Sequence, residues 1–150
     1  MAIRSTQPRI RVLQLAEANL AARQLGGCLG CVQGTTVAIG VSDPSTGNLV
    51  CLAVCATPSD TRFADPHTLE LKCLLTADAR EEHVRRLLRG VEQHLSAKGY
   101  RRIVRRTAAG STPTLDVTGW TQAAACGWRN CDGRTGPGVV WSKVLRGDLH

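Results

Sequence analysis

The chain has 150 residues, of which 43% are hydrophobic and 21% charged, and it carries a formal net charge of +7. This length leaves room for one domain whose core needs neither a disulfide nor a metal ion, and the apolar content excludes wholesale disorder. No apolar run is long enough to cross a membrane as a helix, and the first residues lack the apolar core of a secretion signal. We therefore expect a single cytoplasmic domain over residues 1–150, with residues 1–8 as a flexible N-terminal segment.

The first half of the chain predicts a strand, a helix and a β-hairpin. Basic and apolar residues alternate over residues 9–15, as in an edge strand. Good helix formers over residues 16–25 end at a Gly-Gly pair. The β-branched run 35–42 and the apolar run 49–57 flank a turn rich in Asp, Pro, Gly and Asn, so we expect these two runs to pair.

The second half predicts a strand–helix–strand crossover, then a helix and a final strand. Residues 69–75 alternate and then become continuously apolar, like a central strand. A long amphipathic helix follows, with Asp78 and Glu81 as a capping-box-like start and Gly99 as its end. Its apolar stripe consists of Val84, Leu87, Leu88, Val91 and Leu95. We expect strands at 100–107 and 139–145 and a helix at 115–126. This order predicts a mixed α/β domain in which the strands flanking the long helix are parallel neighbours.

Positive charge is concentrated between Ala79 and Arg106, where the sequence has nine Lys or Arg residues and three Glu. Such a field attracts a polyanion: a nucleotide cofactor, a nucleic acid or an acidic protein. A solvated helix face is the simpler interpretation, but the charge continues through a strand, which favours a functional patch. Strand alternation puts Arg102 and Arg106 on one face and Arg101 and Arg105 on the other, so we expect one pair to matter more. The candidate anion contacts are Arg86, Arg89, Arg101, Arg102, Arg105 and Arg106.

The seven cysteines are an odd number, and buried reduced thiols are the simplest interpretation without a secretion signal. Cys28 and Cys31 form a C-x-x-C pair, which with Cys126 and Cys131 would provide four thiolates for zinc. The second pair is loose and distant, and the first follows a predicted helix rather than beginning one. We therefore expect neither a metal site nor a redox site. The four histidines match no catalytic or metal spacing and are expected at the surface.

Several stretches resemble the GNAT acyltransferase superfamily. The strand ending Leu74-Leu75-Thr76, then Arg80, then a basic helix ending Ala97-Lys98-Gly99-Tyr100 and a further strand are similar to the core of that superfamily. Residues 124–128, Ala-Ala-Cys-Gly-Trp, are similar to its C-terminal helix end. The likeness extends over residues 9–145 and implies a single-domain GNAT-like sheet. A degenerate glycine loop makes the chain similar to the divergent phage and bacterial members, which include the Mom-type DNA-modifying proteins.

The resemblance implies an acyl-CoA donor whose pyrophosphate lies at the start of the basic helix. It implies a general-base role for Glu70, for which the alternative is a carboxylate that only faces solvent or pairs with Lys72. The family has glycines where this chain has His83 and Arg85, and a general-acid Tyr where it has Ala123. We therefore predict that acetyl-CoA or another acyl-CoA binds weakly or not at all, and that weak binding becomes stronger when both residues are changed to Gly. The implied cofactor contacts are Leu74, Leu75, Thr76, Arg80, His83, Val84 and Arg85.

Three functions stay open at this point. The first is acyl transfer from an acyl-CoA-type donor to an amine acceptor. The second is binding or modification of nucleic acid on the same fold, with the arginine-rich segment on the phosphates. The third is a non-enzymatic domain that binds a protein partner, as phage-type inhibitors do. Binding of acetyl-CoA is expected of the first function, and salt-dependent binding of duplex DNA of the second.

Overall fold

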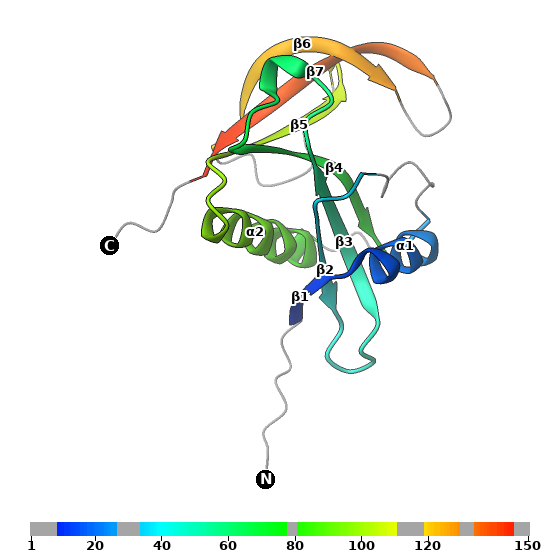
Figure 1. Cartoon of the computed structure of the whole chain (residues 1–150). Coiled ribbons are helices and arrows are strands. Elements are labelled where there is room, and N and C mark those ends of the chain that lie inside the picture. Colours follow the sequence, from blue (N-terminus) through cyan, green and yellow to red (C-terminus); the bar gives the residue numbers. More distant parts are fainter. Residues whose placement is uncertain (1–8, 27–33, 78–80, 111–118, 130–133, 146–150) are drawn as a thin grey trace.

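The computed structural model describes residues 9–26, 34–77, 81–110, 119–129 and 134–145 (Figure 1). The predicted N-terminal segment 1–8, the cap residue Asp78 and Arg80 lie outside these residues, as do Cys28, Cys31 and Cys131. The described part forms one sheet with the strand order β1-β2-β3-β4-β5-β7-β6. No helix in this part is long and apolar enough to cross a membrane.

The elements follow the predicted order through the first two-thirds of the chain. The strands β1 (Arg9–Leu13), β2 (Val37–Ser42), β3 (Leu49–Ala56) and β4 (Thr68–Thr76) pair antiparallel in sequence, with helix α1 (Leu15–Gln24) between the first two. Helix α2 (Glu81–Ala97) then connects β4 to β5 (Arg102–Ala108). Strands β4 and β5 are parallel neighbours, which confirms the predicted crossover.

The two helices pack on opposite faces of the sheet, as Figure 1 shows for the strands β2 to β4. The predicted apolar stripe of α2 forms the larger core with Ile39, Val41, Cys51 and Ile103. The alanines of α1 pack against Leu52, Val54 and Cys73 on the other face. Burial of β2 and β3 on both faces explains their continuously apolar sequences.

The parallel pairing of β4 and β5 is short. It comprises Thr68 with Arg102, Leu69 with Ile103, and Glu70 with Val104, and no further pair forms between these two described strands. Both strands continue beyond that point, and each is held by its outer neighbour, β3 or β7. We call the two diverging segments, 71–76 of β4 and 105–108 of β5, the fork. Its apex is the Glu70–Val104 pair.

A β-bulge in β4 lies at the apex of the fork. Cys55 of β3 pairs with Leu71 and Val54 pairs with Cys73, which leaves Lys72 as an extra residue in β4. The bulge changes the direction of the side chains that follow it. Leu71 therefore packs in the core on the α2 face, whereas Cys73 packs in the core on the α1 face.

The C-terminal third differs from the prediction. Residues 121–126, expected in a helix, belong to strand β6 (Thr121–Arg129), which pairs antiparallel with β7 (Thr135–Val144). The start of the predicted helix, 115–118, lies outside the described residues. The alanine-rich sequence favours a helix locally, but pairing along β7 prevails over that propensity. The likeness of residues 124–128 to a family helix end is therefore wrong, because they lie in a strand.

Close packing between β5, β6 and β7 leaves no room for a side chain at one glycine of β7. A Cβ at Gly138 would lie 2.7 Å from Trp128 Cβ and 2.9 Å from the Thr107 carbonyl oxygen. We expect Gly138→Ala to lower the free energy of unfolding by about 1–3 kcal/mol, because backbone on one side must shift. Gly136→Ala in the same strand meets nothing within 4 Å and is the matched control. Urea denaturation measures both variants, and equal midpoints would contradict the prediction.

Candidate functional site at the β4–β5 fork

Glu70 lies at the apex of the fork and is only 3% exposed. One carboxylate oxygen, Oε2, accepts a hydrogen bond from Nε of Arg106 at 3.1 Å. The other, Oε1, accepts from the backbone N–H of Ser59 at 3.0 Å and lies 3.4 Å from Nζ of Lys72. Two cationic side chains and a backbone amide thus contact the Glu70 carboxylate. Glu70 is also the only carboxylate in β4 and β5.

Lys72 makes the longest contact with Glu70 in this group, and its side chain is partly exposed. Its ammonium also donates to the Ser59 hydroxyl. The sequence-based alternative for Glu70, pairing with Lys72, is therefore confirmed, and Arg106 and the Ser59 amide are added to it. An amine that approaches Oε1 would have to take the place of this ammonium.

The segment before β4 is tied to β5 and β6 by a short 3-10 helix, η2 (Thr61–Phe63). Phe63 is buried against Val104 and Val140, and the guanidinium carbons of Arg62 and Arg102 lie 5.8 and 5.3 Å from the centre of its ring. The Arg62 guanidinium donates to the carbonyl of Ala125 in β6 and to Asp60. The hydrogen bonds that Asp60 accepts from Arg62 lower the pKa of Asp60 to about 2. This packing fixes the loop that supplies the Ser59 amide.

Arg102 and Arg106 both pair with an acidic side chain on the face of the sheet against which η2 packs. Arg102 Nη2 donates to Asp65 at 3.1 Å, its Nε donates to the Thr68 hydroxyl, and Arg106 donates to Glu70. The predicted common face of these two arginines is confirmed. Asp65 and Ser59 were not recognised from the sequence, although the Asp-Pro-His-Thr turn at 65–68 was a local signal for a carboxylate that bonds its own backbone.

Arg105 is placed differently from the other arginines. It is the first β5 residue beyond the apex, and its Nη1 is buried with no hydrogen-bond partner in the described part of the chain. Burial lowers the pKa of its guanidinium, and the only opposing influence comes from the Cys73 thiol across the fork. The fork therefore contains a desolvated cation that no described carboxylate neutralises.

The start of α2 differs in part from the expected anion site. Its first turn carries Glu81 and Glu82, both exposed, and Arg85 donates to Glu81 at 2.7 Å. The expectation that His83 is at the surface is wrong. The helix turns it inward, where it is only 9% exposed and lies near Asp43 of the β2–β3 turn. Val84 is buried in the core, and Leu74, Leu75 and Thr76 are half-buried in the fork.

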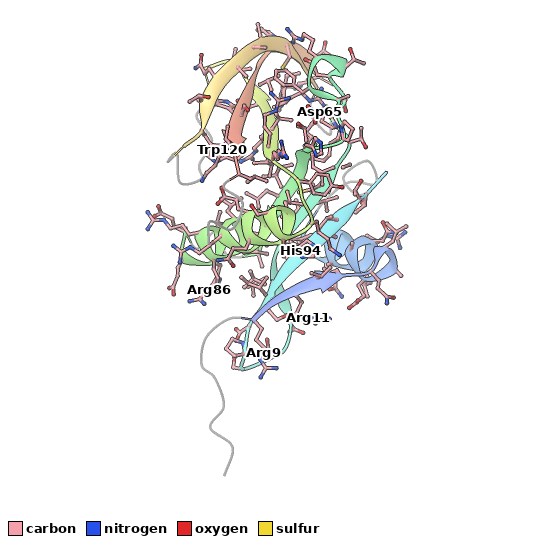
Figure 2. All side chains as sticks on the ribbon, turned by 60° about the vertical axis from the view of Figure 1, so that its left-hand side comes forward. Arg9, Arg11, Asp65, Arg86, His94 and Trp120 are labelled. Atoms are coloured by element: carbon pink, nitrogen blue, oxygen red, sulfur yellow. The ribbon has the colours of Figure 1, made fainter. Side chains whose placement is uncertain are left out.

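The arginines of the basic segment do not form one surface. Arg86 lies on the outer side of α2, far from Asp65, the partner of Arg102, in Figure 2. Arg85, Arg86 and Arg89 line an open groove of about 570 Å³ beside Ile10 of β1. Arg101 is exposed, and Arg105 lies in the fork. The arginines of the predicted functional patch are therefore divided between the groove beside α2, the fork, and the face of the sheet against which η2 packs.

Four cysteines lie in the described residues, and all are free thiols. Cys51, Cys55 and Cys73 are buried, as expected of small hydrophobes, whereas Cys126 lies half-buried in β6. Among the described residues no group of three His, Cys, Asp or Glu side chains is suited to hold a metal ion. The four-thiolate hypothesis involves Cys28, Cys31 and Cys131, which the structure does not describe.

The described thiols are expected to differ widely in reactivity. Burial raises the pKa of Cys55 to about 12, so at pH 8 only about one thiol in ten thousand is ionised. Burial also raises the pKa of Cys126, but this side chain is accessible. In the native protein we expect iodoacetamide to label Cys126 at least about 100-fold faster than Cys55. Peptide mass spectrometry measures both rates, and unfolding in urea, which should equalise them, is the control.

Comparison with known proteins supplies the family context for this geometry. No family model matches the sequence, and no curated protein matches it. Solved structures do match. An N-acetyltransferase from Staphylococcus aureus Mu50 is 15% identical, with a TM-score of 0.67 over 93% of this chain and 99% of that one. An acetyltransferase of the GNAT family from Streptococcus pneumoniae is 10% identical, with a TM-score of 0.66 over 93% and 100%. The chain has the GNAT fold.

The GNAT fold is common to proteins with different acceptors. The ribosomal-protein-S18-alanine N-acetyltransferase from Escherichia coli is 12% identical, with a TM-score of 0.64 over 96% of this chain and 97% of that one. The match extends over nearly the whole length of both chains. At these sequence identities the likeness establishes the arrangement of strands and helices. The acyl donor and the acceptor have to be argued from the residues of the site.

Proposed function

We propose that the protein is an acyltransferase that transfers an acyl group from an acyl-CoA-type thioester to an amine, with the reacting groups at the fork. The observation that carries this proposal is the fork itself. Two parallel strands separate directly after Glu70, and beyond that point no described pairing joins β4 to β5, so an extended chain could enter between them. The acetyltransferase neighbours that share this fold support the reaction class.

The proposed transfer needs one proton acceptor close to the amine. The amine nitrogen forms a bond with the thioester carbonyl carbon, the carbon–sulfur bond breaks, and the products are an amide and a thiol. The proton lost by the nitrogen moves to the Glu70 carboxylate and from there to the departing thiolate. Arg106 holds Glu70 from Oε2, which leaves Oε1 to the amine once Lys72 moves aside.

The residues at the fork fit the thioester part of the donor better than the start of α2 fits a pyrophosphate. Glu81 and Glu82 occupy the helix turn where backbone N–H groups would attract phosphate oxygens, and they repel an anion there. Arg85 stands where the family has a glycine, and its bulk also disfavours a pyrophosphate at this turn. We therefore propose that binding is weak and depends on the acyl and pantetheine part of the donor.

Calorimetry with the full chain and acetyl-CoA tests this proposal directly. We expect a dissociation constant well above 1 μM, and mass-spectrometric detection of free CoA when a mixture of primary amines is added. Submicromolar affinity would contradict the predicted weak binding. Absence of both heat and thermal stabilisation at millimolar concentration with acetyl-CoA and with longer acyl-CoA thioesters would contradict the acyltransferase proposal. Glu70→Gln serves as a control that retains donor binding, because the carboxylate acts on the acceptor.

The groove beside α2 favours one second function, binding of nucleic acid. This open groove is lined by Arg85, Arg86 and Arg89, which outnumber the two carboxylates there, Glu81 and Glu82. Nε of Arg86 is buried without a partner in the described residues. This alternative predicts that Arg86→Glu with Arg89→Glu abolishes binding of a labelled DNA duplex, while Arg23→Glu on α1 leaves it unchanged. Fluorescence anisotropy at two salt concentrations measures it, with a log–log slope of about 0.9 per phosphate. No binding at low salt would exclude this function.

A further inference from the structure

Within the fork, positive charge exceeds negative charge. The residues at and beyond the apex include Lys72, Arg105 and Arg106 as cations, and Glu70 as the only anion. Glu70 already contacts Lys72 and Arg106. Arg105 is therefore left with a buried Nη1 that has no partner among the described residues. A cationic nitrogen buried without a partner is costly for the folded protein, so its presence at a candidate site indicates that a ligand supplies the anion.

The position of Arg105 indicates which part of a ligand it meets. The fork narrows toward the Glu70–Val104 pair, and Arg105 is the first residue of β5 beyond it. A chain inserted between the strands reaches this residue with its innermost end. Among the described residues, the group across the fork whose charge would act on Arg105 is the buried thiol of Cys73, and no carboxylate does so.

We propose that Arg105 receives the terminal carboxylate of the acyl group, so that the donor is the thioester of a dicarboxylic acid, such as succinyl-CoA. This inference rests on the proposed acyltransferase function and adds the class of acyl group. A guanidinium binds a carboxylate through two parallel N–H···O bonds, which neutralise its charge and satisfy the buried Nη1. An acetyl group ends in a methyl and leaves the same guanidinium without a partner.

Titration calorimetry of the full chain with succinyl-CoA and butyryl-CoA tests the inference, because the two acyl chains differ mainly in the terminal carboxylate. We expect the wild type to bind succinyl-CoA about 10- to 100-fold more tightly. Arg105→Met should remove this preference and leave the affinity for butyryl-CoA unchanged. Arg101→Met, at an exposed arginine just before β5, is the matched control and should keep the preference.

The outcomes separate this inference from the proposed function. Binding of both thioesters with equal affinity, or a preference that survives Arg105→Met, overturns the role of Arg105 and leaves acyl transfer standing. Failure of every thioester to bind overturns both. Urea denaturation provides a second readout without ligand: Arg105→Met should unfold at the same or a higher midpoint than the wild type, because a buried charge without a partner has been removed. A markedly lower midpoint would indicate a structural role and contradict the inference.

Discussion

Glu70→Gln is expected to lower the rate of acyl transfer by about 10²- to 10⁴-fold, while the protein stays folded and still binds the donor. The amide keeps the size of the side chain and an oxygen for the Ser59 amide, but it cannot take a proton. Turnover is measured as CoA released, by mass spectrometry. Glu92→Gln on α2, which breaks the ion pair with Lys143 of β7, is the matched control and should retain the wild-type rate.

A purely structural role for Glu70 would give a different result. In that case Glu70→Gln and Glu70→Ala would lower stability by about 1–3 kcal/mol, because Arg106 and Lys72 lose their common partner, and the rate per folded molecule would stay near that of the wild type.

Leu87→Ala is expected to lower the free energy of unfolding by about 2–5 kcal/mol, the largest stability effect that we predict. Leu87 is fully buried in the core between α2 and the sheet, together with Val91, Leu95 and Ile103. Its truncation leaves a cavity beneath the helix that connects the two strands of the fork. Chemical denaturation followed by circular dichroism measures the loss.

The matched control for Leu87→Ala is Leu20→Ala on α1, because Leu20 is 58% exposed. This variant removes the same atoms from a helix and should change stability by no more than about 0.5 kcal/mol. Similar losses in the two variants would show that α2 is not packed as the structure describes. Since Ile103 adjoins the fork in sequence, we also expect Leu87→Ala to weaken donor binding at temperatures where the variant is still folded.

Local sequence patterns were sufficient wherever the spacing of apolar residues or the chemistry of a turn determines an element. The apolar stripe of α2, the hairpin of β2 and β3 and the parallel crossover were all predicted, because periodicity and turn chemistry determine them. Prediction failed at β6, where the alanines of 123–125 favour a helix. Their strand conformation depends on pairing with β7, which a single-sequence pattern does not reveal.

The candidate site was predictable in its residue types and only partly in its arrangement. From the sequence alone came the GNAT-like fold, Glu70 on the central strand and an excess of arginine after it. The tertiary structure decided which arginine pairs with which acid: Asp65 holds Arg102, Glu70 holds Arg106, and Arg105 has only the Cys73 thiol across the fork. The physical reason is that each partner lies on a different strand or loop, and a β-bulge at Lys72 sets the directions of the side chains around the apex.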